Sequence, residues 1–275
     1  MFDRKDMQKI KIKLVTLGNL KYPVDFQFIK KWKSKIFSAE HLDQIQILPE
    51  MDGEKWSYTD KLLANLIKSD KNYDFTVGMI NYRLEKNYYV RRVGKDLCML
   101  SLYETAEIIH DANLTIENFI IRNLYEFCSI YLEYGRDASL VEYSVAHDET
   151  RSCLFDMCGN KADLVFSTAR PRICEPCKAR IMQSQLSNEF ISNIEKELCR
   201  IRKSLYYRLT DFIKGNLILA ITITSMSAIL LSVIAKVIYD VFKSLLIPSL
   251  FQGEQQEKIQ FLTPSQRQES LLKSE

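Results

Sequence analysis

Four cysteines in two pairs are the residues whose types and spacing point most directly to chemistry. Cys153 and Cys158 are separated by four residues, and Cys174 and Cys177 by two. Two short pairs of thiolates suit a tetrahedral zinc ion, because each pair supplies two ligands from one turn and the intervening loop brings the second pair back. The spacing therefore predicts a zinc site in the region from His147 to Cys177.

The fourth ligand of this site has two candidates. Cys174 and Cys177 are preferred first, since two intervening residues is the usual zinc-knuckle spacing. The wider Cys153–Cys158 pair is less constrained, and His147, six residues before Cys153, could replace Cys158 to give a Cys3His set. The order of preference is Cys174, Cys177, Cys153, Cys158 and then His147. Four protein ligands leave no position for a catalytic water, so the expected role of the zinc is structural.

A catalytic zinc of the usual peptidase type is not expected. The motif H-E-x-x-H needs two histidines four residues apart on one helix, with a glutamate as the base. The three histidines of the chain, His41, His110 and His147, are much farther apart than that. His147 with Asp148 or Glu149 could still supply one ligand and one acid or base.

The composition is that of a globular protein. The chain has 275 residues, of which 47% are hydrophobic and 27% charged, enough for one large domain or two small ones. A formal net charge of +3 is too small to favour nucleic acid as a partner. The first residues are charged where a secretory signal would be apolar, so we expect a reducing cytosol, in which paired cysteines bind metal more often than they form disulfides.

The elements that must position the cysteines alternate between strand and helix patterns. This order favours an α/β domain with a mixed sheet over residues 1–185. A helix with its cap at Thr115 and its end before Gly135 is the clearest of these elements. Strands are expected at residues 10–17, 44–48, 74–84, 88–103 and, between the cysteine pairs, 164–166; further helices are expected at 23–37 and 57–69.

Residues 186–214 predict a long amphipathic helix, a helical stalk after the α/β domain. Five apolar residues follow alternating steps of three and four, as in a coiled coil, but for only about two heptads. The helix could pack against the domain, or it could associate with a second copy of the chain into a homo-oligomer. The five residues are Ile191, Ile194, Leu198, Ile201 and Leu205.

Residues 216–235 contain no charged side chain. Such a helix is long enough to cross a hydrocarbon core of about 30 Å, so we expect a single transmembrane helix within 215–240. Lysines and arginines are more frequent before it than after it, which places the N-terminal domain in the cytoplasm by the positive-inside rule. Residues 241–275 are polar, and we expect them to be disordered.

The cysteine pattern at the end of an α/β domain resembles that of the archaemetzincin family of zinc metallopeptidases, over about residues 10–182. The resemblance implies a zincin-like fold in which Cys153, Cys158, Cys174 and Cys177 bind a structural zinc. In that family the helix with the catalytic histidines runs directly into the first cysteine. Here Glu142 and Ala146 stand where the first two histidines would be. The resemblance therefore implies a domain that has kept its structural zinc and lost its catalytic zinc.

Three functions are consistent with these features. The first is a membrane-anchored, non-catalytic, zinc-stabilised domain that senses a signal or binds a protein partner. The second is an enzyme, a divergent zinc metallohydrolase that uses His147. The third is a membrane-perturbing effector, in which the cytosolic domain controls the assembly of transmembrane helices.

Overall fold

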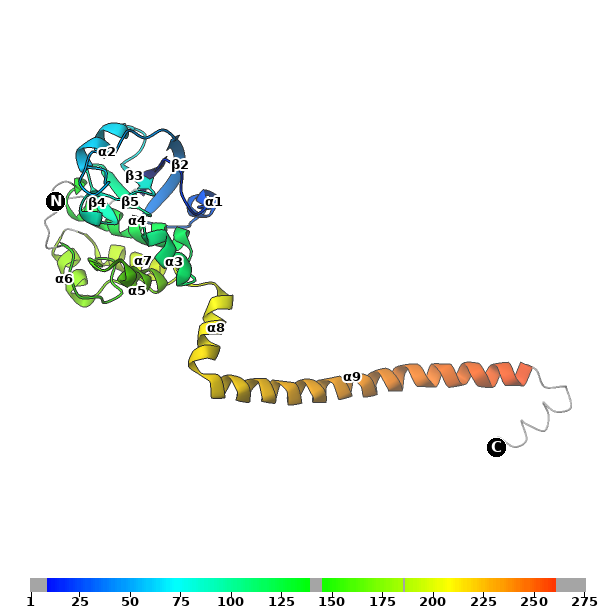
Figure 1. Cartoon of the computed structure of the whole chain (residues 1–275). Coiled ribbons are helices and arrows are strands. Elements are labelled where there is room, and N and C mark those ends of the chain that lie inside the picture. The colour runs from blue at the N-terminus through cyan, green and yellow to red at the C-terminus, as the bar shows by residue number, and fades with distance from the viewer. Residues whose placement is uncertain (1–8, 139–144, 185, 261–275) are drawn as a thin grey trace. The chain divides into compact units, whose positions relative to one another are not determined.

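The computed structural model describes residues 9–138, 145–184 and 186–260, with side chains described up to residue 243. The chain divides into two compact units, Met1–Tyr207 and Arg208–Glu275. The first is an α/β domain and the second is helical (Figure 1).

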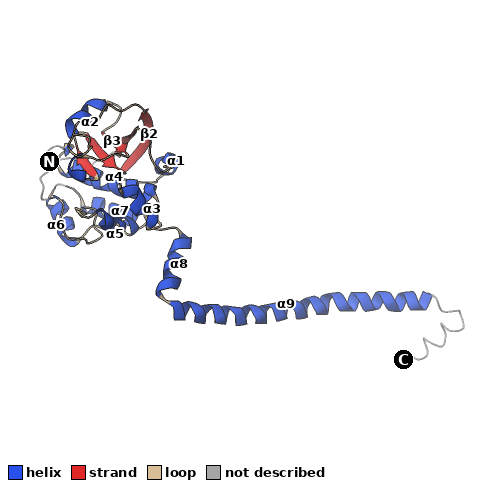
Figure 2. Ribbon diagram, viewed as in Figure 1, coloured by secondary structure: helices blue, strands red, loops and turns tan. Residues whose placement is uncertain are grey.

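Unit 1 is built on one mixed sheet of five strands among the described residues, in the order β2-β1-β3-β5-β4. Strand β1 pairs in parallel with β2 and β3, β3 pairs in parallel with β5, and β4 alone runs antiparallel. The sheet and its surrounding helices are seen in Figure 2. The predicted mixed α/β sheet is thus confirmed. The strands are β1 (Ile10–Leu17), β2 (Phe37–Ile45), β3 (Phe75–Ile80), β4 (Val90–Arg92) and β5 (Leu97–Ser101).

The central strands are buried on both faces, because helices cover the sheet on each side. Every residue of β3 and β5 is buried, as are seven of the eight residues of β1. The larger core lies between the sheet and α4 (Ile116–Glu133), and the smaller core lies under α2 (Asp60–Leu66). The shorter elements are α1 (Phe26–Lys30), η1 (Glu85–Asn87), α3 (Thr105–Asp111), η4 (Lys161–Asp163), α5 (Leu164–Ala169) and α6 (Glu175–Gln183).

Helix α4 forms where the sequence predicts it. The Thr115 side chain caps the helix by accepting a hydrogen bond from the backbone N–H of Asn118 at 3.2 Å. The chain leaves the helix just before Gly135, whose φ of +66° belongs to the left-handed region that glycine tolerates. From Ile116 to Tyr131 only Glu117 of this helix is not fully buried. Helix α4 is therefore the central support of unit 1.

Two predicted elements in the first half are wrong. The helix expected at 23–37 is only the short α1, which Asp25 caps by accepting from the backbone N–H of Phe28. The strand expected at 44–48 is β2, which begins at Phe37 and ends at Ile45. The cause is pairing with a distant segment: β1 satisfies the backbone of β2 from Phe37 onward, and this outweighs the local helical pattern.

The strand expected at 164–166 is also wrong, since these residues begin α5. Asn160 caps the preceding turn η4 by accepting from the backbone N–H of Ala162 at 3.1 Å. The turn leads directly into α5, so local capping decides the conformation here.

The stalk expected at 186–214 is not one helix. Helix α7 (Asn188–Leu198) and helix α8 (Leu205–Gly215) are separated by residues 199–204. The predicted seam divides in the same way: its first four residues are buried in the larger core, whereas Leu205 is 77% exposed. Helix α7 therefore has the packed amphipathic arrangement, one of the two alternatives open from the sequence.

The Glu197 carboxylate fixes α7 to the N-terminal half of unit 1. The hydroxyls of Tyr125 and Ser34 both donate to it at 2.6 Å, and the backbone N–H of Lys35 donates at 2.7 Å. Trp32 in turn donates its indole N–H to Tyr125. A buried carboxylate with several donors is a specific connection, so α7 is an integral part of the domain.

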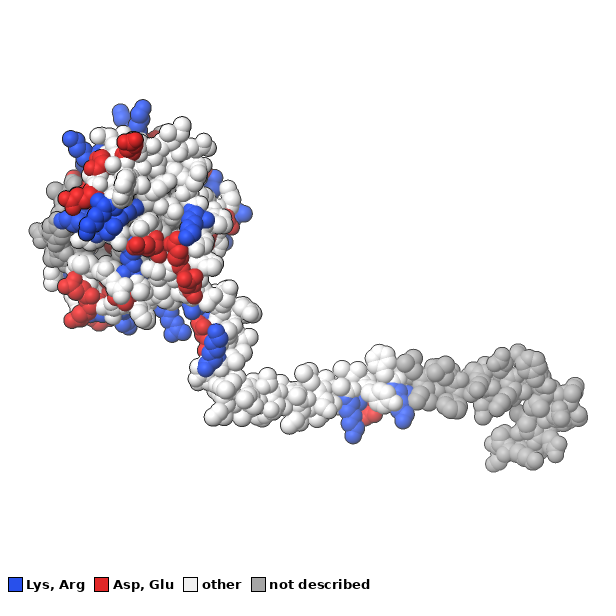
Figure 3. Space-filling view, viewed as in Figure 1, with Lys and Arg blue, Asp and Glu red and all other residues white. Residues whose placement is uncertain are grey.

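Unit 2 contains α9 (Leu217–Gln260). Its segment Leu217–Lys243 is long and apolar enough to cross a membrane, and none of that segment is buried against the rest of the described chain. The segment has no acidic or basic side chains over its first turns, as its white surface shows (Figure 3). Helix α9 continues through residues 241–260, which the sequence predicted to be disordered; the remainder of that tail, 261–275, lies outside the described residues.

Candidate metal centre

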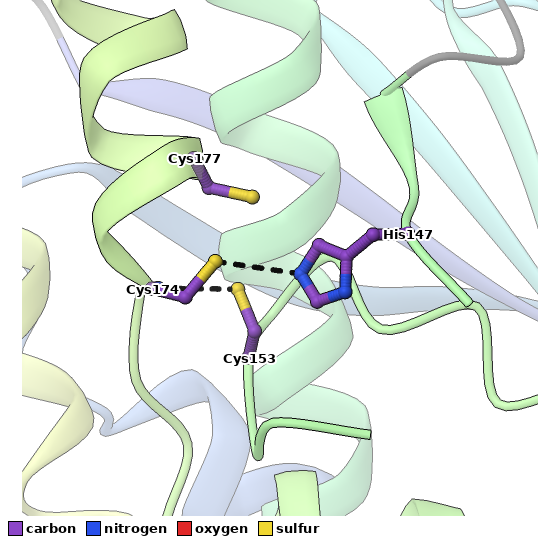
Figure 4. A group of neighbouring side chains, drawn as sticks. All are labelled: His147, Cys153, Cys174 and Cys177. Carbon is purple, nitrogen blue, oxygen red and sulfur yellow. Dashed lines mark hydrogen bonds between the residues drawn. The ribbon is translucent and has the colours of Figure 1, made fainter. Parts of the chain in front are cut away.

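Four of the five predicted metal ligands come together in unit 1. The donor atoms of His147, Cys153, Cys174 and Cys177 all lie within 4.8 Å of one another. Their side chains point toward a common centre (Figure 4). The fifth candidate, Cys158, is not part of this group.

The start of α6 positions Cys174 and Cys177. Cys174 is the N-cap residue, and its carbonyl accepts the first helical hydrogen bond, from Lys178 N–H at 2.9 Å. Pro176 fits the first turn, where its missing N–H leaves no carbonyl unpaired. The two cysteines therefore lie on the same turn at the start of α6.

A folded-back loop brings His147 and Cys153 to the same place. The backbone N–H of His147 donates to the Phe155 carbonyl oxygen at 3.1 Å. The backbone N–H of Leu154 donates to the Arg172 carbonyl oxygen at 2.8 Å. The second contact lays the Cys153 segment beside the residues that lead into α6. As a result, the backbone N–H of Cys174 donates to the Cys153 sulfur at 3.3 Å.

The geometry of the four donors fits zinc. Bond lengths of about 2.3 Å to sulfur and 2.0–2.1 Å to nitrogen in a tetrahedral site place neighbouring sulfur and nitrogen ligands roughly 3.5 Å apart. The Cys174 sulfur lies 3.4 Å from His147 Nε2. Three sulfur atoms and one imidazole form a set typical of structural zinc, whereas magnesium and calcium prefer oxygen. The expected zinc-binding group is therefore present, as a Cys3His set.

The pKa values of two cysteines in the cluster are shifted in opposite directions. The Cys177 thiol donates to the Cys153 sulfur, and together with backbone N–H groups this holds the pKa of Cys153 below its ordinary value despite burial. The same hydrogen bond raises the pKa of Cys177. Zinc binds the thiolate form of cysteine, so metal binding would release the proton of the Cys177 thiol.

Asp156 fixes the loop beside the histidine ligand. Its Oδ2 accepts from the backbone N–H groups of Cys153 at 2.9 Å and Arg151 at 3.0 Å. Its Oδ1 lies 3.4 Å from His147 Nδ1, which is also 3.0 Å from the Glu149 carbonyl oxygen. A proton on Nδ1 is donated to the Glu149 carbonyl oxygen and leaves the Nε2 lone pair for a metal. Burial raises the pKa of Asp156, as expected for a carboxyl that faces a ligand set instead of water.

Cys158 has a different environment. Its thiol is buried, and burial raises its pKa to about 11. A neutral, buried thiol outside the donor group is a packing group, not a ligand. The structure therefore brings together the Cys3His alternative instead of the preferred four cysteines. The loop brings His147 close to the cysteine ligands. The spacing of the cysteines does not predict this contact.

Helix α4 carries a second polar site that the sequence interpretation missed. Arg122 is fully buried and forms an ion pair with Glu126, one turn later. It also donates to Asn123 at 2.8 Å and to the carbonyl oxygens of Cys153 and Leu154. The signal was present: charged residues in the middle of an apolar helix must have buried partners. Arg122 thus joins α4 to the loop that carries the first cysteine ligand.

Arg122 is not itself a metal ligand, because a guanidinium has no lone pair for a metal and stays charged in proteins. Although burial opposes the charge of Arg122, the nearby acidic groups outweigh burial and raise its pKa.

The remaining candidates for catalysis are dispersed. His41 stacks on Phe26, and its Nε2 is 2.8 Å from the Thr16 hydroxyl, while His110 stacks on Tyr22. Glu149 is paired with Arg151, which lowers the pKa of this carboxyl. Of the two positions where the resemblance would place histidines, Glu142 lies outside the described residues, and the other is Ala146.

Comparisons with known proteins give one solved structure. No protein-family model and no curated protein matches the chain. The chain is similar to the crystal structure of archaemetzincin from Methanopyrus kandleri, with 12% sequence identity and a TM-score of 0.41. The match covers 67% of this chain and 98% of that chain. Zinc is inferred for this chain from its own donor atoms.

Proposed function

We propose that the chain is a membrane-anchored, non-catalytic domain, stabilised by zinc, that senses a signal or binds a protein partner. The observation that carries this proposal is the closed donor set. His147, Cys153, Cys174 and Cys177 supply four ligands, the full number for tetrahedral zinc, and a catalytic site would need one position for water.

The spacing of the histidines supports the absence of hydrolysis. A zinc peptidase needs a metal-bound water and a base beside it. The H-E-x-x-H motif that provides them needs two histidines four residues apart, and His41, His110 and His147 are much farther apart than that. The fold therefore serves recognition in this proposal, with zinc as a structural element.

The apolar segment Leu217–Lys243 supports the anchor. Its length matches a bilayer, and basic residues such as Arg202, Lys203 and Arg208 precede it. In this proposal the chain crosses the membrane once, with unit 1 on the cytoplasmic side.

Zinc analysis of the full chain, purified in detergent, tests the proposal. We expect one zinc per chain, as for the single donor cluster, and no cleavage of unstructured protein substrates. The variants Cys174→Ser and Cys177→Ser should lose the metal, while Cys199→Ser, at an exposed cysteine outside the cluster, should keep it.

A metallohydrolase would give a different result. Zinc-dependent hydrolysis that disappears in His147→Ala or Glu149→Gln would overturn the non-catalytic function. Two bound zinc ions per chain would also contradict it, because only one cluster of ligands is present in the described residues.

A further inference from the structure

Helix α8 has an apolar face that the described residues leave uncovered. At 3.6 residues per turn, five large apolar side chains of this helix fall on one side. Their exposed fractions range from 41% to 77%, and no residue of α8 is buried. The five are Leu205, Tyr206, Leu209, Phe212 and Ile213.

The opposite side of α8 is polar and mainly basic. It carries Arg208, Asp211 and Lys214, and the chain just before the helix adds Arg202 and Lys203. Four cationic groups thus accompany one carboxylate. A helix with an apolar stripe beside lysines and arginines is the pattern of a peptide that lies on a membrane surface or in the groove of an acidic partner.

The position of α8 in the chain favours the membrane. Helix α9 begins at Leu217, two residues after α8 ends at Gly215. If α9 enters the bilayer at its first turn, α8 must lie at the level of the lipid headgroups. A helix of eleven residues is marginal in water without a surface that stabilises it. A bilayer provides that surface directly beside α8.

We propose that α8 lies in the plane of the membrane interface on the side of unit 1. Its apolar face enters the boundary between headgroups and acyl chains, and its arginines and lysines contact anionic lipid phosphates. Tyr206 is then an interfacial aromatic, a residue type enriched at this depth. The inference rests on the proposed membrane anchor and adds a surface that recognises lipid charge.

The test uses two neighbouring tyrosines in the full chain, reconstituted in phosphatidylcholine vesicles with and without phosphatidylglycerol. Tyr206 belongs to the apolar face, whereas Tyr207 falls on the polar side. We expect brominated lipids to quench the added indole of Tyr206→Trp several-fold more than that of Tyr207→Trp. The native Trp32 and Trp56 are common to both variants and to the parent, so their signal can be subtracted.

Alkaline carbonate extraction separates the two proposals. If the protein resists extraction but the two variants are quenched equally, the membrane anchor is supported and the interfacial helix is overturned. If the protein is fully extracted but the variants differ in quenching, the anchor is overturned and the interfacial helix is supported. If the protein is extracted and the variants are quenched equally, both proposals are overturned.

Charge-reversal variants test whether the cations of α8 recognise anionic lipid. Arg208→Glu and Lys214→Glu should reduce the extra quenching that phosphatidylglycerol causes in the Tyr206→Trp background. Lys55→Glu, at an exposed lysine of unit 1, is the control and should change nothing. Equal quenching with and without the anionic lipid in the parent would overturn the recognition of lipid charge.

Discussion

The zinc cluster and the Arg122 site are two polar centres that share one residue. The Cys153 sulfur belongs to the first, and the Cys153 carbonyl oxygen accepts from Arg122 in the second. The four donors of the zinc cluster would surround a metal cation, as the acceptors around Arg122 surround its guanidinium. The zinc cluster must take its cation from solution, whereas the Arg122 site contains its own. The zinc cluster therefore depends on the supply of metal, and the Arg122 site does not.

Removing zinc should have the largest effect. The apparent binding free energy of a structural zinc in small domains is about 10–16 kcal/mol, as large as the whole stability of a typical domain, about 5–15 kcal/mol. Cys174→Ser and Cys177→Ser should therefore leave unit 1 largely unfolded at ambient temperature, as circular dichroism would show. Cys199→Ser serves as the control. A native spectrum in the zinc-free variants would contradict the structural role of the cluster.

Breaking the Arg122 site should be severe but independent of added zinc. Arg122→Met leaves the buried Glu126 without its partner and removes the Arg122 hydrogen bonds to the carbonyl oxygens of Cys153 and Leu154. Removal of one partner of a buried ion pair costs about 3–5 kcal/mol. Urea denaturation of the full chain in detergent would measure the loss.

The double variant Arg122→Met, Glu126→Met provides the sharper test. It removes both charges, so we expect it to be more stable than Arg122→Met alone. If the two are equally unstable, the carbonyl contacts of Arg122 outweigh its ion pair.

Asp156→Asn should affect only the zinc cluster. The change keeps the size of the side chain but removes the negative charge that faces His147 Nδ1 at 3.4 Å. Loss of such a group behind a ligand typically weakens metal binding by about 10–100-fold. Competition with a chromophoric chelator measures the affinity. Unchanged affinity would mean that the Glu149 carbonyl alone orients the histidine.

Cys158→Ala should have the smallest effect. Cys158 lies outside the donor group and is buried, so the variant should lose roughly 1 kcal/mol of stability, as for other small deletions from a core. Its zinc content should equal that of the parent, whereas His147→Ala should bind zinc more weakly. The reverse result would restore the set of four cysteines that the spacing favours.

Local signals were sufficient for part of the fold. The strand at 10–17 and the helix capped by Thr115 were predicted because their patterns and caps agree with their tertiary environment. Strand β2 was misplaced because its pairing partner lies some 27 residues earlier in the register Ile10↔Phe37. Such pairing leaves no trace in a short window of sequence.

In the candidate site, too, some residues could be predicted from local sequence and others could not. Cys174 and Cys177 lie on one turn of α6, and their spacing alone was enough to identify them. The choice between Cys158 and His147 depends on how a loop folds back on itself, which spacing does not determine. Arg122 and Glu126 were overlooked because an amphipathic pattern assigns charged residues to solvent, whereas α4 is buried nearly all round.

The break between α7 and α8 limits how far the domain can reach. Ile201 is buried in unit 1, and α8 begins at Leu205, so four residues of extended chain span at most roughly 14 Å. If α8 lies on the bilayer, unit 1 stays close to the lipid surface. Its search for partners is then confined to two dimensions. A partner on the same membrane would meet the domain at a high effective concentration, so even weak contacts could be productive.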